Sequence, residues 1–303
     1  MTALQSDRIA SSERTRPRGF TDWKPRAATE ALLDDVRLVL GTYRAQLPLM
    51  VRQIYYRLVA SFGYEKTGRF SERLGETLNR ARRAQLIQMS AIRDDGRSWD
   101  KPWGFADADD LWNDIEDTLN NARLDASSGQ PVRQMVICEA RGMVPTLSQV
   151  AHQFGAPVLG TSGFCSLTVI YNLAKQIAAE GRPVLIHHIG DLDPSGVHLF
   201  QAMADDVAAF VADLGGDVTF RRLAVTREQA DRFNLPTAPP KKSDRRAFAG
   251  ETVQAEALPP DVLQDLLRQA LEANFDHDAY SARQAVFEDE QVDMTAQWSR
   301  GGS

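Results

Sequence analysis

Apolar residues recur at helical spacing in three short segments near the start of the chain. These segments, residues 28–45, 49–63 and 71–84, predict three helices separated by short turns. Residues 89–92 then read as an extended stretch, and the Asp95-Gly96 dipeptide that follows is a hairpin signal. Three short helices followed by a basic hairpin predict a winged helix, a form of the helix-turn-helix in which the third helix contacts DNA.

A different pattern begins after residue 131, where short apolar runs alternate with helical segments. The apolar runs are residues 135–138, 157–159, 183–186 and 218–225, and the helical segments between them are 144–154, 166–179 and 197–214. This alternation predicts an α/β fold with a mainly parallel sheet flanked by helices. Beyond residue 226 the pattern weakens, with a further strand expected at 252–258 and a helix at 259–274.

These patterns divide the chain into three parts. We expect a flexible arm at residues 1–27, a winged-helix domain at 28–125 and an α/β domain at 131–295. The length of 303 residues agrees with about two domains, since a domain averages roughly 150 residues.

Charge is distributed unevenly over these parts. The whole chain carries a net charge of -6. Residues 51–101, however, hold eleven Lys and Arg against six Asp and Glu, whereas residues 251–293 hold eleven acids against two arginines. A basic domain beside an acidic one predicts that the first binds a polyanion, here double-stranded DNA. The expected DNA contacts are the arginines of the third helix and of the hairpin: Arg73, Arg80, Arg82, Arg83 and Arg97.

The composition excludes several classes of protein. No apolar run approaches the roughly 20 residues that span a bilayer, and the first residues lack a signal sequence, so we expect a cytoplasmic protein without a membrane partner. Cys138 and Cys165 are the two cysteines of the chain, without a CxxC motif or a Cys/His cluster. The sequence therefore predicts neither a zinc site nor a disulfide.

Acidic residues follow two of the predicted strands. Glu139 comes directly after the first apolar run, and Asp191 and Asp193 come after the third. The carboxyl ends of parallel strands line the ligand crevice of an α/β fold, and carboxylates suit Mg²⁺, with Mn²⁺ as an alternative ion. Gly190 and Gly196 would leave room for a phosphate backbone. A lone DxD is also found as solvated loop acids and in aspartyl-phosphate phosphatases. We expect the neighbouring histidines, 187 and 188, to pack or to support the site rather than to bind metal.

A second candidate group lies on the second predicted helix, in the motif Arg52-Gln53-Ile54-Tyr55-Tyr56. Arg52 and Tyr56 are four residues apart and share a helix face, so the guanidinium could hold a phosphate where the phenol would attack it. The alternative is that both tyrosines simply pack inside the module.

Taken together, the two groups resemble a known family. A glutamate after one strand and a DxD after another resemble the Toprim domain of topoisomerases, primases and some nucleases. A winged helix with an Arg-x-Ile-aromatic-Tyr motif before a Toprim domain resembles the A subunit of type IIB topoisomerase VI and its meiotic double-strand-break relatives. The resemblance covers residues 30–275 and is closest to the stand-alone prokaryotic group called Topo mini-A.

The resemblance implies an activity and a role for each residue. Tyr56 would form a covalent 5′-phosphotyrosyl link to DNA with help from Arg52, and Glu139, Asp191 and Asp193 would bind Mg²⁺. The protein would act as a homodimer in which each tyrosine meets the partner's metal site. ATP-driven strand passage would need a separate partner subunit. Two positions depart from the family pattern: Gln53 stands where an acid is common, and Ser162 where a lysine often precedes the glycine.

Two other functions remain open at this point. One is a metal-dependent Toprim nuclease that uses water, with Tyr56 as a structural residue. The other is a non-catalytic DNA-binding protein whose acids bind a metal that organises the fold.

Overall fold

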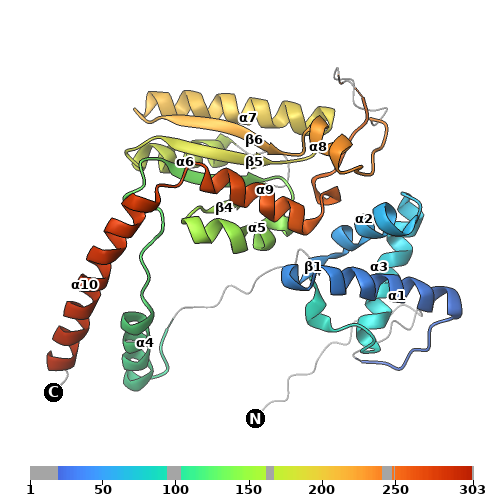
Figure 1. Ribbon diagram of the computed structural model, residues 1–303, viewed down its shortest axis with the longest axis horizontal. Coiled ribbons are helices and arrows are strands. Elements are labelled where there is room, and N and C mark those ends of the chain that lie inside the picture. Colours follow the sequence, from blue (N-terminus) through green and yellow to red (C-terminus); the bar gives the residue numbers. More distant parts are fainter. Residues whose placement is uncertain (1–19, 94–103, 162–166, 241–247, 249, 302–303) are drawn as a thin grey trace, which may run out of the picture.

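The computed structural model describes residues 20–93, 104–161, 167–240, 248 and 250–301. Figure 1 shows a helical unit, residues 20–93, beside a larger α/β unit, residues 131–276, with two further helices projecting from the latter. The arm predicted at residues 1–27 lies mostly outside the described residues. So do the hairpin expected after residue 93, with Arg97, and the Ser162-Gly163 position.

The helical unit contains the three predicted helices in the expected order. They are α1 (Ala27–Thr42), α2 (Val51–Phe62) and α3 (Gly68–Arg83). Gly63 ends α2 at a φ of 73°, a left-handed conformation that glycine adopts without steric cost. Thr67 begins α3 by accepting a hydrogen bond from the Phe70 amide at 3.2 Å.

Two short strands complete this unit and differ from the prediction. Strand β1 (Leu49–Met50) pairs in parallel with β2 (Ile92–Arg93). The extended stretch expected at residues 89–92 is instead a 3₁₀ turn, Met89–Ala91, followed by β2. That prediction was wrong in its bounds because a segment of four residues is too short to show a period.

The α/β unit is built on a four-stranded sheet in which every neighbouring pair is parallel, as predicted. The strands are β3 (Arg133–Cys138), β4 (Val158–Gly160), β5 (Val184–Ile189) and β6 (Val218–Ala224), in the spatial order β4-β3-β5-β6. Cys138, the last residue of β3, is paired with Ile189, the last residue of β5. The two strands therefore end at the same level.

Helices cover both faces of this sheet. They are α5 (Val144–Ala151), α6 (Leu167–Ala179), α7 (Pro194–Asp213), α8 (Arg227–Arg232) and α9 (Pro260–Glu272). Met135 and Ile137 of β3 pack with α6 and α7, whereas the alternating residues Val136 and Cys138 share a core cluster with α5 and α9. Alternate residues of β3 face opposite sides of the sheet, and both sides are covered by helices. This is why residues 135–138 form a continuous apolar run.

Past β6 the chain departs from the expected strand at residues 252–258. Thr252 and Val253 form isolated antiparallel bridges, and a 3₁₀ turn, η5 (Ala255–Ala257), follows them. The prediction of a strand at residues 252–258 is thus correct for two residues only. The helix expected at 259–274 is α9.

Helices α4 (Ala108–Asn121) and α10 (His277–Gly301) lie side by side and project from the α/β unit (Figure 1). The Trp112 and Trp298 rings lie 4.9 Å apart, and the Gln291 amide donates to the Leu119 carbonyl at 2.7 Å. Helix α10 continues six residues past the predicted end of the second domain, residue 295, and pairs with a helix that the sequence assigned to the first.

Basic side chains of the helical unit join it to the α/β unit. Arg57 of α2 donates to the Ala257 carbonyl, Lys66 to the Pro236 carbonyl at 2.9 Å, and Arg93 to the Gly142 carbonyl. Some of the positively charged side chains of residues 51–101 therefore bond groups of the same molecule. No helix in the described part of the chain is both long and apolar enough to cross a bilayer.

Candidate functional site

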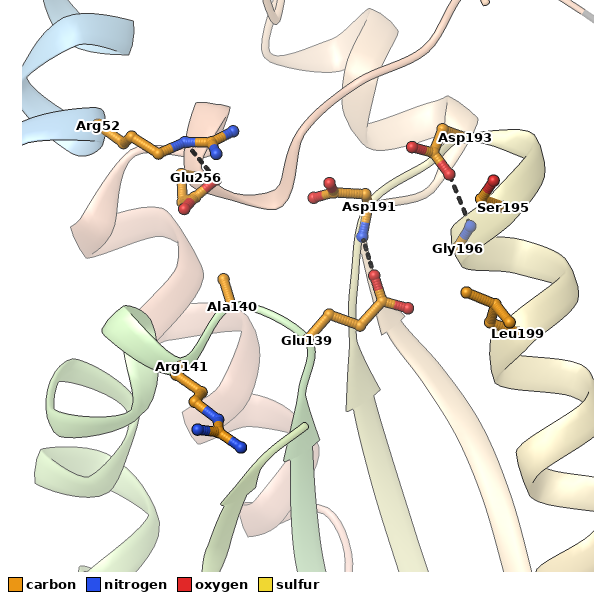
Figure 2. A pocket seen from close by; sticks show the side chains of 10 residues that line it. All are labelled: Arg52, Glu139, Ala140, Arg141, Asp191, Asp193, Ser195, Gly196, Leu199 and Glu256. Carbon is orange, nitrogen blue, oxygen red and sulfur yellow. Dashed lines mark hydrogen bonds and ion pairs between the residues drawn. The ribbon is translucent and has the colours of Figure 1, made fainter. Parts of the chain in front are cut away.

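The predicted acids meet at the carboxyl ends of β3 and β5. These strands are neighbours at the point where the strand order reverses, the position at which open α/β sheets form their ligand crevice. A cavity of about 560 Å³ opens there (Figure 2). It is lined by Arg52, Glu139, Ala140, Arg141, Asp191, Asp193, Ser195, Gly196, Leu199 and Glu256.

Glu139 is an ionised carboxylate held by two neighbours. Its Oε2 accepts the Asp191 amide at 3.1 Å, and its Oε1 lies 3.5 Å from His188 Nε2. Burial opposes ionisation of Glu139, but the bonds from His188 and from the Asp191 amide outweigh it and lower its pKa. Burial likewise lowers the pKa of His188, so the imidazole is neutral and supports the carboxylate through Nε2. The expected supporting role of His188 fits this contact.

Asp191 is bound on both oxygens by the segment before and within η5. Its Oδ1 accepts the Ala255 amide at 2.8 Å and its Oδ2 accepts the Gln254 amide nitrogen at 3.0 Å. Burial raises the pKa of Asp191, the Ala255 bond opposes this, and the charges of Glu139 and Asp193 raise the pKa further. The positive charge of Arg52 acts in the opposite direction and lowers the pKa of Asp191.

Asp193 has a structural role besides any role in binding. As the N-cap of α7 its Oδ1 accepts the Gly196 amide at 2.6 Å. This oxygen and Glu139 Oε2 each lie 3.3 Å from the point that a Cβ on Gly196 would occupy, so the two oxygens are separated by at most twice that distance. A Cβ on Gly190 would lie 2.6 Å from Glu139 Cδ and from His188 Cε1. The glycines thus leave room for the acids and for His188 before any ligand enters.

The chemical types of the site residues suit a hard cation, but the positions of these residues do not form a complete metal site. Four carboxylates line one cavity, those of Glu139, Asp191, Asp193 and Glu256, and oxygen ligands are what Mg²⁺ prefers. In the described ranges, however, no three His, Cys, Asp or Glu side chains are grouped closely enough to hold a metal ion. Mg²⁺ keeps several waters when bound, so it needs fewer direct protein ligands than Ca²⁺. The Mg²⁺ site stays a prediction.

Arg52 and Tyr56 reach this region from α2. Arg52 lines the cavity, with Nε 3.3 Å from Glu256 Oε2, and its guanidinium is close enough to the Tyr56 phenol to influence the pKa of that group. Tyr56 is only 5% exposed, and burial raises its pKa to about 12 although Arg52 acts to lower it. Tyr55 instead packs on Phe70, with the rings 5.6 Å apart. The structure therefore connects Tyr56, rather than Tyr55, to the cavity through Arg52.

Three residues near the acids were not found from the sequence. Arg222 of β6 is partly buried and donates to the Gly190 and Asp191 carbonyls at 3.0 and 2.7 Å. Gln254 and Glu256 come from the segment that was read as a strand. An arginine inside an apolar strand run is a signal that could have pointed to Arg222, whereas no local pattern marks Gln254 or Glu256.

The predicted DNA-contacting arginines differ in exposure. Arg73 and Arg80, seven residues apart on α3, are exposed and share a helix face. Arg82 and Arg83 at its end are partly buried, and Arg97 lies outside the described residues.

Comparison with known proteins gives one match. Residues 118–266, slightly less than half of the chain, match a family model described as "Protein of unknown function C-terminus (DUF2399)". This region contains Glu139, Asp191, Asp193 and Glu256, and it leaves out α2 with Arg52 and Tyr56. No curated protein matches the chain.

Proposed function

We propose that this protein is a Mg²⁺-dependent DNA-cleaving transesterase of the topoisomerase VI A type, acting as a homodimer on duplex DNA. One observation carries the proposal: Arg52, from the tyrosine-bearing helix, lines the same cavity as Glu139, Asp191 and Asp193 (Figure 2). If the tyrosine motif and the three acids belonged to unrelated sites, we would not expect them to meet at one cavity. Electrostatic stabilisation and a positioned nucleophile are the two parts that such a reaction needs.

The fold supports the same proposal. We assign the helical unit as a winged helix on its three helices and its short β1–β2 pair. We assign the α/β unit as a Toprim domain on its parallel sheet, with one acid after β3 and a DxD after the neighbouring β5.

In the proposed reaction, Arg52 binds the backbone phosphate and directs it toward the Tyr56 hydroxyl. The phenol loses its proton, its oxygen bonds to phosphorus, and the 3′ oxygen leaves as an alcohol after taking up a proton, so the 5′ phosphate stays on Tyr56. Bound Mg²⁺ would supply positive charge that offsets the charge developing on the phosphate. Glu139, Asp191 and Asp193 would hold it, and His188 and Arg222 would keep two of these acids in position.

Denaturing the protein during its reaction with duplex DNA and Mg²⁺ tests this proposal. We expect DNA covalently attached to the protein, at Tyr56. Tyr56→Phe removes one hydroxyl and should abolish the adduct while DNA binding is kept. Tyr55→Phe is the matched control, because it removes the neighbouring hydroxyl on the same helix and should leave the adduct intact. An adduct that maps to Tyr55 would show that the nucleophile is misassigned.

The second candidate is a Toprim nuclease that uses water, and the state of Tyr56 favours it. A phenol that is 5% exposed, with a pKa raised by burial to about 12, is a weak nucleophile until an approaching cation lowers that pKa. DNA cleavage without an adduct, unchanged in Tyr56→Phe, would select this candidate. Metal-dependent DNA binding without cleavage would select the non-catalytic one.

A further inference from the structure

The segment Gln254-Ala255-Glu256 lies between α2 and the strand ends. Two of its groups, the Ala255 amide and the Gln254 side-chain amide, bond Asp191 on the sheet side. Two others, the Gln254 side-chain oxygen Oε1 and the Glu256 carboxylate, contact Arg52 on the α2 side. The segment is therefore in contact with both the predicted metal-binding acids and the predicted phosphate-binding arginine.

Gln254 connects the two groups directly. Its amide oxygen accepts from Arg52 Nη2 while its amide nitrogen donates to Asp191 Oδ2 at 3.0 Å. An amide has one acceptor end and one donor end, so it can bridge a guanidinium and a carboxylate that would otherwise need to meet directly. This bridge fixes the distance between the arginine and the acid.

Glu256 differs from the other acids of the cavity in its surroundings. Its side chain is 8% exposed, whereas that of its partner Arg52 is 54% exposed. A buried carboxylate is costly without a cation, and Arg52 supplies one, with its Nε 3.3 Å from Glu256 Oε2. A guanidinium has five N–H donors in a rigid plane, so contacts at Nε and Nη2 fix its orientation and leave other donors available for Tyr56 and a ligand. Figure 2 shows Glu256 on the far side of the cavity from Asp193, facing Arg52.

We propose that Glu256 is a positioning residue that, together with Gln254, fixes the Arg52 guanidinium beside Asp191. Glu256 acts through Arg52 and is not a metal ligand. The inference rests on the proposed function in one respect, namely that Arg52 binds the DNA phosphate.

A double-mutant cycle tests this role in the full-length protein. The variants are Arg52→Ala, Glu256→Ala and the two combined, with Glu256→Gln as the conservative change. Asp265→Ala is the control, because it removes an exposed acid from α9 of the same unit. Three quantities are measured: duplex DNA affinity without metal, which needs no chemistry; the rate of DNA cleavage with Mg²⁺; and Mn²⁺ affinity by electron paramagnetic resonance.

We expect Glu256→Ala to weaken DNA binding several-fold and to slow cleavage about 10- to 100-fold, the usual effect of losing a supporting contact. The combined variant should be no worse than Arg52→Ala, because Glu256 has no effect without Arg52. Glu256→Gln keeps an acceptor for Nε and should restore part of the loss. Mn²⁺ affinity should be the same in all variants and in the control.

Two results would overturn the inference. Independent, additive losses in the cycle would mean that Glu256 does not act through Arg52, and weaker Mn²⁺ binding in Glu256→Ala would make it a metal ligand. Unfolding of Glu256→Ala would be recognised by circular dichroism, and Glu256→Gln then carries the cycle. If the wild-type protein does not cleave DNA, the proposed function fails, but the cycle in DNA affinity still decides the role of Glu256.

Discussion

Buried ionisable groups surround the strand ends, and their protonation states follow from their immediate neighbours. Burial lowers the pKa of His187 to about 4, helped by Arg221, and its Nε2 lies 2.9 Å from the Gln134 side-chain oxygen. Burial also raises the pKa of the Cys138 thiol to about 12, which makes it unreactive at neutral pH. The interior of the sheet is thus kept neutral, while the charges are concentrated at its carboxyl edge.

His187 should make the protein sensitive to acid. Its folded-state pKa of about 4 is below the ordinary value of 6.5, so the unfolded state binds more protons between these values. Stability is therefore fully present above about pH 6.5 and is lost as the pH falls toward 4, by up to about 3 kcal/mol. Urea unfolding at pH 7 and pH 4.5 measures this loss. It should be smaller in His187→Gln, and unchanged in a control variant of the exposed His277, His277→Gln. An equal acid loss in His187→Gln would assign the sensitivity to other groups.

The residues that could be predicted from the sequence share one property: each follows directly from a local pattern. Glu139 and the DxD acids come immediately after apolar runs, so their place at the strand ends needs only the strand assignment. Gln254 and Glu256 depend on how a poorly patterned segment folds against α2, which no local signal encodes. Gln53 lies between these two cases, because the sequence marks it as a departure from the family pattern but does not give its contact. Its oxygen accepts the Met50 amide at 2.9 Å at the start of α2, a capping role that an acid could also fill.

At the scale of elements, α2 and α3 use their positive charges differently. The arginines of α2, Arg52 and Arg57, contact the α/β unit. Those on the exposed face of α3, Arg73 and Arg80, point to solvent. The prediction of a basic DNA-binding face from residues 51–101 therefore applies best to α3, because charge counting alone cannot separate surface arginines from those that join two units.

Exchanging Arg73 and Arg80 for alanine should weaken DNA binding in a salt-dependent way. Each phosphate contact contributes about 0.9 to the slope of log affinity against log salt concentration, so the double variant should lower that slope by up to about 2. Fluorescence anisotropy with duplex DNA at several salt concentrations measures it. Arg268→Ala, on α9 in the acidic region, is the control and should leave the slope unchanged. An unchanged slope in the double variant would mean that α3 does not face the DNA.

At the scale of the whole molecule, the contacts between the two units lie within one chain. Arg52, Arg57, Lys66 and Arg93 all bond groups of the α/β unit of the same chain, and Arg52 lines its cavity. The resemblance to topoisomerase VI implies the opposite arrangement, in which a tyrosine meets the metal site of the partner. The α/β fold could be predicted from alternating patterns, but the docking of one unit on the other could not, because it depends on carbonyl acceptors that no side-chain pattern marks.

These contacts predict that α2 and the carboxylates act within the same chain. Tyr56→Phe and Asp191→Ala each remove one part of the site, and the two variants can be co-expressed with different tags and purified as a mixed dimer. If the parts act within one chain, both sites of this dimer carry a defect and no adduct should form. If they act between chains, one site has the intact tyrosine of one protomer and the intact acids of the other, and about half of the wild-type sites should react. An adduct on the Asp191→Ala chain of the mixed dimer would therefore contradict the prediction. Wild-type protein that carries both tags and is purified in the same way serves as the positive control.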